Sequence, residues 1–230
     1  MSAVSLRLDW CSYEAAKYAV QHWHYSQSLP TSPLVKVGVW EEGQFIGCVL
    51  FSRGSNNNML LPYGLTMIQG CELTRVALTT HQAPTSQIVS IALRLLRYQA
   101  PGLRLIISYA DPNHGHHGGI YQAMGWLYAG QTAADVQYVD QKGRIWHRRQ
   151  VSRTGVSRQY GILRRVPSFA ECHAVPLQGK HRYLYPLDAA MRAQLLPFAQ
   201  PYPHRATSIQ DAPDVQSGEG GAAPTVALQE

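Results

Sequence analysis

The chain has 230 residues, enough for one large domain or for a domain with a tail. Hydrophobic residues make up 45% of it and charged residues only 15%, and the net charge is +6 with a pI near 9.2. This balance permits a buried core and is compatible with an anionic partner. The spacing of the four cysteines excludes a zinc module, and no apolar run approaches the roughly 18 residues of a membrane span. We expect no signal peptide and a reduced, cytoplasmic protein.

The first half of the chain predicts a helix followed by strands. Apolar residues recur at helical spacing over 13–24, after Ser12 as a helix cap. The stretch VKVGVWEEGQFIGCVLFS predicts a β-hairpin with strands 35–41 and 44–52. Alternation over 71–79 predicts a further strand.

The next elements predict a parallel crossover. Residues 88–99 have helical periodicity, and 103–111 form an apolar run that is typical of a central strand covered on both faces. A short helix over 118–126 and two or more strands within 127–151 follow. A strand–helix–strand unit beside an antiparallel hairpin indicates a mixed α/β sheet flanked by helices.

Positive charge gathers late in the chain. Residues 142–182 hold ten of the twenty Lys and Arg and a single acid, Glu171, with aromatic residues interleaved. Arginine and lysine neutralise phosphates and aromatic rings stack on bases, so this pattern favours DNA over the alternative of an ordinary solvated ribbon. The expected DNA-binding residues are Arg148, Arg149, Arg153, Arg158, Lys180 and Arg182. We expect one catalytic domain over 1–198, with a basic strip at 142–185, and a disordered tail over 199–230, which has few large apolar residues.

Polar residues end the predicted central strand. Ser108 and Asp111 lie where ligands of open α/β sheets gather, so Asp111 is a candidate base, although Asp-Pro-Asn is also a good turn sequence. The histidines that follow, at 114, 116 and 117, have no spacing that suits a zinc site. Gly118 and Gly119 precede a helix and predict the mouth of a cofactor pocket.

Two further candidate sites follow from their positions in or just after the strand 71–79. Thr85, Ser86 and Gln87 open the helix after the strand 71–79, where backbone N–H groups can bind a phosphate. The turn before them lacks glycine, so an ordinary helix start remains the alternative. Arg75, in that strand, is expected to face a substrate or to form a structural ion pair.

The cluster His22-Trp23-His24-Tyr25 cannot be buried on one helix face. His24 and Tyr25, at the end of the first helix, are therefore candidates to meet a substrate, against the alternative of surface residues. His24 could also ligate a metal together with groups from elsewhere in the chain.

The ordered set of motifs resembles a known family. The succession of EEGQFIGCVLF, ELTRVAL, LIISYAD and IYQAMGW resembles the GNAT acyltransferase fold. More narrowly, WHYSQSLP, ELTRVAL, SYADPNHGHHGGIYQAMGWLYAG and GKHRYLYPLD are similar to the Mom family of phage DNA-modification proteins. The resemblance covers about residues 10–190.

The resemblance implies a GNAT-like fold and an activity. It implies conversion of adenine in DNA to an N6-methylcarbamoyl (acetamido) adenine, which protects phage DNA from restriction in the host cytoplasm. It also implies an acyl donor such as acetyl-CoA, and a bound iron has been suggested for the family. The positions that match the family's polar motifs, and hence the implied catalytic residues, are His24, Tyr25, Arg75, Ser108, Asp111 and Tyr121.

The residues themselves leave two alternatives open. One is a conventional acetyl-CoA-dependent N-acetyltransferase, and the other is a non-catalytic DNA-binding protein on the same fold. The missing glycine-rich turn at 80–86 puts routine acetyl-CoA binding, and hence the identity of the donor, in question.

Overall fold

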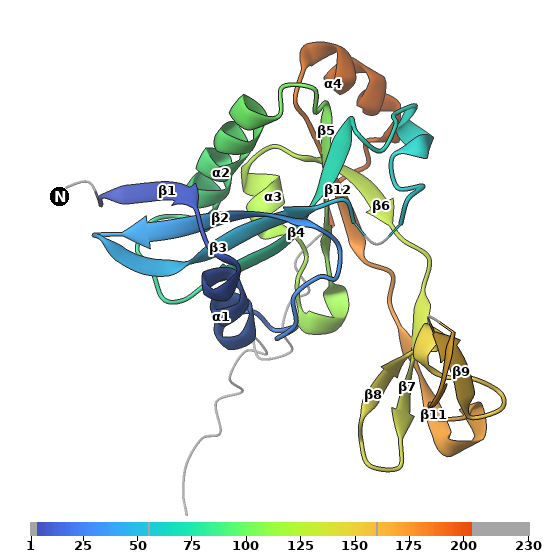
Figure 1. The fold of residues 1–230 in the computed structure, drawn as a ribbon. Coiled ribbons are helices and arrows are strands. Elements are labelled where there is room, and N and C mark those ends of the chain that lie inside the picture. Colours follow the sequence, from blue (N-terminus) through green and yellow to red (C-terminus); the bar gives the residue numbers. More distant parts are fainter. Residues whose placement is uncertain (1–3, 55, 160, 204–230) are drawn as a thin grey trace, which may run out of the picture.

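The structure is a computed structural model and describes residues 4–54, 56–159 and 161–203. Its centre is a seven-stranded sheet in the order β1-β2-β3-β4-β5-β12-β6, shown in Figure 1. The strands are β1 (Leu6–Trp10), β2 (Leu34–Glu41), β3 (Gln44–Ser52), β4 (Gly70–Leu78), β5 (Leu105–Ala110), β6 (Leu127–Gln131) and β12 (His181–Pro186). All neighbours are antiparallel except β4 and β5, so the predicted mixed α/β sheet is confirmed.

Four α-helices flank the central sheet, and they are α1 (Tyr13–Trp23), α2 (Thr85–Gln99), α3 (Gly119–Ala123) and α4 (Ala189–Leu195). Alternation along β5 sends Ile106 into a core with α2 and α3, and sends Ile107 into a core with α4 on the opposite face. The helix α1 packs on that second face against Cys48 and Leu50 of β3. Ser12 caps α1 as predicted, because its hydroxyl accepts from the backbone N–H of Ala15 at 3.1 Å.

A small β-lobe, defined as residues 133–178, projects from the body between β6 and β12 (Figure 1). One of its sheets has the order β11-β7-β8, from β11 (Cys172–Leu177), β7 (Asp135–Asp140) and β8 (Ile145–His147). The strands β9 (Val156–Gln159) and β10 (Ile162–Arg165) form a separate hairpin. The expected continuous basic strip 142–185 is therefore divided, since β12 returns to the central sheet.

The end of the described chain packs against the body. The backbone N–H of Gln200 donates to the carbonyl of Tyr128 at 2.8 Å, and the hydroxyl of Tyr202 donates to the carbonyl of Trp126 at 2.7 Å. The predicted tail boundary at 199 is therefore too early, because these hydrogen bonds tie the segment to β6 and its approach. The rest of the expected disordered tail, 204–230, lies outside the described residues.

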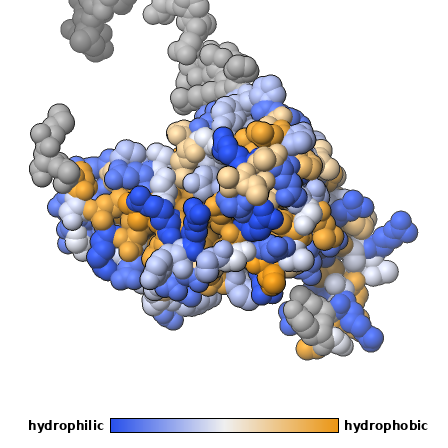
Figure 2. All heavy atoms as spheres, turned by 90° about the horizontal axis from the view of Figure 1, so that it is seen from above, coloured by the Kyte–Doolittle hydropathy of each residue, from blue (hydrophilic) through white to orange (hydrophobic). Residues whose placement is uncertain are grey.

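Viewed from above, hydrophilic and apolar side chains are interspersed over the surface (Figure 2), so this face does not single out a binding site. Among the described residues, no helix has the length and apolar character needed to cross a membrane.

Candidate functional site

The site begins where two parallel strands separate. β4 and β5 pair only from Gly70–Leu73 against Leu105–Ser108, although β4 continues to Leu78. Beyond this point β4 and β5 no longer form backbone hydrogen bonds with each other, so a gap opens between their carboxyl ends. The sheet thus creates an opening at the carboxyl end of β5, where the sequence predicted a ligand.

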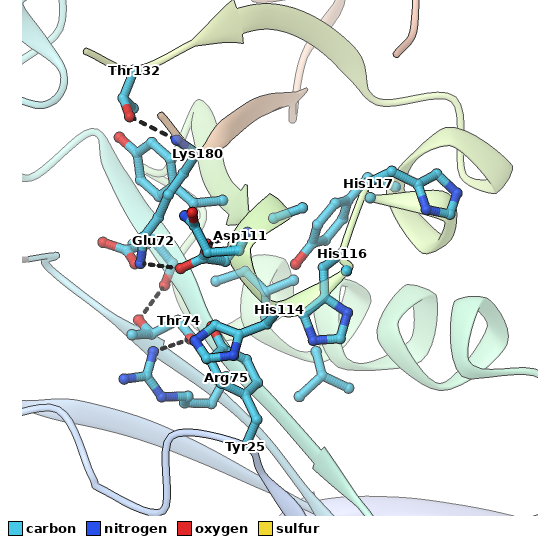
Figure 3. Close-up of a pocket in the computed structure, with 18 of the residues that line it drawn as sticks. Tyr25, Glu72, Thr74, Arg75, Asp111, His114, His116, His117, Thr132 and Lys180 are labelled. Atoms are coloured by element: carbon cyan, nitrogen blue, oxygen red, sulfur yellow. Dashed lines mark hydrogen bonds and ion pairs between the residues drawn. The ribbon is translucent and has the colours of Figure 1, made fainter. Parts of the chain in front are cut away.

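A cavity of about 950 Å³ occupies this opening, a size within the usual range for small-molecule sites. Its wall comes from the end of α1, from β4 and β5, from the loop before α3 and from the near side of the β-lobe. Figure 3 shows side chains from these separate segments converging on it. The predicted residues that line it are His24, Tyr25, Arg75, Thr85, Asp111, Gly118, Gly119, Tyr121 and Lys180.

Asp111 lies in the cavity wall and is already bound on both oxygens. Its Oδ1 accepts from the backbone N–H and the side-chain amide of Asn113 at 3.0 and 2.8 Å, and its Oδ2 lies 3.1 Å from Lys180 Nζ. Burial alone would raise the pKa of Asp111, but the hydrogen bonds from Asn113 and the charge of Lys180 outweigh it and lower the pKa. The carboxylate is thus better suited to holding Lys180 and the turn than to accepting a proton.

Glu72, a residue on β4 to which sequence reasoning gave no role, has the opposite character. Burial raises its pKa, and the nearby charges of Arg75 and Lys180 offset only part of this rise. No side-chain hydrogen bond from the described residues holds its carboxylate. Figure 3 shows it on the same side of the cavity as Asp111 and Lys180. A carboxylate whose pKa is raised, and whose oxygens accept no side-chain hydrogen bond, is a better proton acceptor near neutral pH than a carboxylate whose pKa is lowered.

Arg75 brings a positive charge to the same wall. Its guanidinium donates to the carbonyl of Thr74 at 2.8 Å, and it forms no ion pair with a described carboxylate. Its Nε is buried without a partner among the described residues. Arg75 thus lines the cavity rather than joining a described carboxylate in an ion pair.

Tyr121 and Ser108 form a buried hydroxyl pair. Ser108 Oγ lies 2.7 Å from the hydroxyl of Tyr121 and 2.7 Å from the carbonyl of Leu73, and the residue is only 1% exposed. Ser108 therefore lies behind the cavity wall and positions Tyr121 rather than meeting a ligand itself. Burial raises the pKa of Tyr121 to about 12, so its hydroxyl keeps its proton at neutral pH.

The histidines of the loop gather around an aromatic ring. The ring centroid of Tyr25 lies 4.4 Å from those of His24 and His114 and 5.3 Å from that of His116. Burial, followed by the charges of Arg75 and the loop histidines, lowers the pKa of His24 to about 4. His24 Nδ1 is hydrogen-bonded to Ser26 Oγ at 2.8 Å. These rings lie tilted against Tyr25, and nowhere in the described chain do three His, Cys, Asp or Glu side chains converge as metal ligands. The side chains present therefore do not fit the suggested iron.

The expected phosphate site at the start of α2 is partly filled by the protein itself. The backbone N–H groups of Gln82 and Ala83 donate to the carboxylate of Glu41, with the shortest contacts at 2.9 and 2.8 Å. These hydrogen bonds lower the pKa of Glu41, which is only 7% exposed. Of the predicted trio, Thr85 lines the cavity, while Ser86 and Gln87 are not part of its wall. The carboxylate of Glu41 therefore accepts hydrogen bonds from the backbone N–H groups just before the helix. The position of Glu41 at the end of β2 does not predict this role.

The glycines before α3 meet a structural need. Gly118 has φ +85°, and a side chain there would overlap the ring of Tyr183. Gly118 therefore lies close to β12 as well as in the cavity wall, where a ligand is predicted. Gly119 also lies in the cavity wall.

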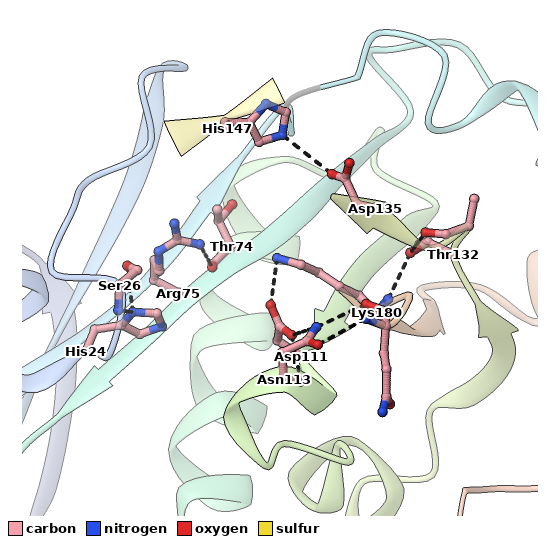
Figure 4. A network of polar contacts seen from close by, with 12 residues as sticks. His24, Ser26, Thr74, Arg75, Asp111, Asn113, Thr132, Asp135, His147 and Lys180 are labelled. Atoms are coloured by element: carbon pink, nitrogen blue, oxygen red, sulfur yellow. Dashed lines mark hydrogen bonds and ion pairs between the residues drawn. The ribbon is translucent and has the colours of Figure 1, made fainter. Parts of the chain in front are cut away.

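The β-lobe forms part of the cavity wall, and Figure 4 shows its His147 and Asp135 above Arg75 and Lys180. Its contribution includes Gln137 and His147, whose Nε2 lies 3.6 Å from Asp135 Oδ2. The predicted DNA-binding residues Arg148, Arg149, Arg153 and Arg158 lie on this lobe and are exposed to solvent. Lys180 instead pairs with Asp111, and Arg182 lies in β12 with its Nη1 3.3 Å from the hydroxyl of Tyr63. These two positions therefore do not extend the basic surface.

Comparison with known proteins identifies the family. The model of the Mom protein family matches residues 5–204. This chain belongs to the Mom protein family. It is 26% identical over 207 residues to the methylcarbamoylase Mom of Escherichia phage Mu, a match that covers 86% of this chain and 83% of the relative. The family resemblance predicted from the sequence is thereby confirmed.

The solved structures that resemble this Mom-family protein include acetyltransferases. One is an IAA acetyltransferase from Bacillus cereus, with 12% identity, a TM-score of 0.45 and coverage of 80% of this chain and 100% of that chain. Another is a Bacillus subtilis acetyltransferase in complex with CoA, also with 12% identity and a TM-score of 0.45, which covers 81% of this chain and 100% of that chain.

Proposed function

We propose that this protein transfers a methylcarbamoyl-type (acetamido) group from a small-molecule donor to N6 of an adenine in DNA. A phage that carries this modification would protect its DNA from restriction in the host. The proposal is supported by membership of the Mom family and by the similarity to the methylcarbamoylase of phage Mu. The observation that carries it is the cavity, whose wall combines proton-handling side chains of the sheet with Gln137 and His147 of the β-lobe, a lobe that carries a net positive charge.

Adenine in a duplex must leave the base stack before its N6 can enter such a cavity. The amine is a weak nucleophile because its lone pair is delocalised into the ring. In the proposed step, N6 forms a bond to the electrophilic carbon of the donor while the bond from that carbon to the leaving group breaks. The N6 proton passes to Glu72, and the leaving group takes its electron pair and a proton from Tyr121. The proton on Glu72 then passes through solvent to the deprotonated oxygen of Tyr121, which restores the hydroxyl.

The assignment of Glu72 replaces that of Asp111 as base, for the electrostatic reasons given above. Asp111 becomes a positioning residue that fixes Lys180 and the turn through Asn113. Ser108 positions Tyr121, and Tyr25 with the surrounding imidazoles offers aromatic rings against which a base can pack. Arg75 offers a charge to an anionic group of the donor or to a phosphate.

The residues at the start of α2 do not fit the diphosphate of coenzyme A, because Glu41 already holds the N–H groups of Gln82 and Ala83. A negatively charged carboxylate there also repels a second anion. We therefore propose a donor that reaches the cavity without placing a diphosphate at this turn. Calorimetric titration with acetyl-CoA is expected to show no binding, and binding at micromolar concentration would favour the conventional N-acetyltransferase instead.

The function is tested by mass spectrometry of nucleosides from plasmid DNA isolated from cells that express the protein. The wild-type protein should yield an altered deoxyadenosine, and Glu72→Gln should lower its amount by about a hundredfold or more, as for loss of a general base. Glu14→Gln, an exposed carboxylate in the first turn of α1, is the matched control. Plasmid DNA with only standard deoxyadenosine would reject the function, and DNA binding without product would select the non-catalytic alternative.

The pH dependence separates the two carboxylates. A base acts when it is unprotonated, so the single-turnover rate should rise with pH through the pKa of the base. Glu72 places this rise above the ordinary 4.5 of a glutamate, whereas Asp111 would place it below the ordinary 3.8 of an aspartate. A rise that lies entirely in the lower range would return the role to Asp111.

A further inference from the structure

One face of the β-lobe continues outward from the cavity. In the pairing of β7 with β8, Gln137 lies opposite His147 and Val139 lies opposite Ile145. Side chains two apart on a strand share a face, so all four point to the same side of the sheet. Gln137 and His147 line the cavity, which places Ile145 on the cavity side, about 7 Å further along the strand than His147.

The other face of this sheet is covered. Tyr138 packs edge-on against Phe169 with ring centroids 5.1 Å apart, and Trp146 donates from Nε1 to Asp140 Oδ2 at 2.9 Å. Among the described residues, no such aromatic contact covers the side that carries Ile145, and Ile145 is 66% exposed. A β-branched apolar side chain thus stands in water beside the mouth of the cavity.

The turn that presents Ile145 is held rigidly. Asp140 Oδ1 accepts from the backbone N–H groups of Lys142 and Arg144, both at 2.9 Å, and its Oδ2 is the acceptor for Trp146. Gly143, at φ +74°, supplies the left-handed residue that the tight turn needs. The carboxylate therefore fixes the end of the β7–β8 hairpin before any ligand arrives.

Cationic side chains lie on both sides of Ile145 in the sequence. Lys142 and Arg144 precede it, and Arg148 and Arg149 follow β8. All four are exposed, so they can contact phosphates while the apolar side chain between them meets the bases. This charge pattern fits duplex DNA rather than an apolar protein surface.

We propose that Ile145 is a wedge that enters the base stack of duplex DNA and fills the space left by the adenine turned into the cavity. The inference rests on the proposed function and adds to it the residue that separates the target from its neighbours. Apolar side chains inserted between base steps are an established way to unstack and kink DNA. Here the wedge lies on the same short hairpin as Gln137 and His147, two residues of the cavity wall, and the cationic residues flank it directly.

The test uses the full chain and a short duplex whose sequence is taken from modified plasmid DNA. Ile145→Ser should slow modification of the duplex by about tenfold or more, because unstacking would lose its apolar support. The same variant should modify a strand in which the target adenine is unpaired at nearly the wild-type rate. Ile162→Ser is the matched control, since Ile162 is 57% exposed on the β9–β10 hairpin, whose described residues do not line the cavity.

A second readout reports the base directly. A duplex that carries fluorescent aminopurine at the target position should brighten with the wild-type protein and with Ile162→Ser, and much less with Ile145→Ser at saturating protein. Equal brightening and equal rates for both variants would overturn the wedge. A loss with Ile145→Ser that is as large on the unpaired target would also overturn it. If the wild-type protein itself gives no product, the proposed function fails instead.

Discussion

The body and the β-lobe are built on different physical terms. In the body, residues such as Trp126, Tyr183 and Ile106 are fully buried in continuous cores. Among the described residues of the β-lobe, only Val151 is buried. The 46 residues of the lobe carry a net charge of +5, whereas the 157 residues of 1–132 and 179–203 together carry +4. The lobe thus concentrates charge where the body concentrates apolar burial.

This difference suggests a division of labour. A well-packed body can hold Glu72, Asp111 and Tyr121 in fixed geometry, as proton transfer requires. A lobe with little core presents most of its side chains to solvent, which suits contact with a long polyanion. Both parts line the cavity, but each contributes different side chains, and changes in each should affect different measurements.

The largest expected effect comes from Asp111→Ala in the body. The change removes the carboxylate that pairs with Lys180 and that accepts the hydrogen bond from Asn113, so the turn at Asn113 is released. The cavity wall then moves, and misplacement by about 1 Å can cost a hundredfold in rate. Nucleoside mass spectrometry should show at least about that loss, while DNA affinity and the far-ultraviolet circular dichroism spectrum stay close to wild type.

Asp9→Ala is the control for this change, because Asp9 forms an exposed pair with Arg7 far along the sheet on β1. The control should retain full modification. If Asp111→Ala also retains modification, Asp111 has no part in the mechanism and the role given to Lys180 must be reconsidered.

Charge reversal in the lobe should give the converse result. Arg148→Glu combined with Arg149→Glu should weaken DNA binding about tenfold or more at moderate salt and reduce the slope of log affinity against log salt by about two. Fluorescence anisotropy over a range of salt concentrations measures both quantities. Modification at saturating DNA should fall much less than in Asp111→Ala.

Arg94→Glu with Arg97→Glu makes the same change in net charge on the exposed side of α2. It should weaken binding only slightly. Equal losses in the two double variants would mean that net charge, and not the position of the lobe, governs binding.

The body was largely predictable from the sequence, and the lobe was not. Local periodicity sufficed for α1, for the β2–β3 hairpin and for β4 and β5, whose observed bounds differ from the predicted ones by one or two residues at most ends. The strand β1 was missed, and so was the insertion of β12 between β5 and β6. Pairing between strands so distant in the sequence leaves no local pattern, so the sequence alone does not predict that the chain returns to the central sheet.

The same reason explains the residues of the site. Asp111, Tyr121 and Arg75 were predictable because they lie at strand ends or match motifs. Glu72 was missed because its character depends on burial and on the neighbours Arg75 and Lys180, the second of which arrives from 108 positions away. Alternation along β4, which puts Glu72 on the opposite side from buried Leu73, was the only available signal.

The smallest expected effect concerns Glu41, which links the end of β2 to the turn before α2 inside the body. Its pKa is lowered by the hydrogen bonds from Ala83 and Gln82, so the charged form stabilises the folded protein above the ordinary pKa of 4.5, and this contribution disappears as the pH falls through the lowered folded-state value. Glu41→Gln should therefore lower the melting temperature by a few degrees at neutral pH, and the difference from wild type should shrink in acid. Thermal unfolding followed by circular dichroism at several pH values measures this, with Glu14→Gln as control. A difference that does not change with pH would mean that shape, rather than charge, makes Glu41 fit the turn, and the argument that its charge keeps a diphosphate away would lose its basis.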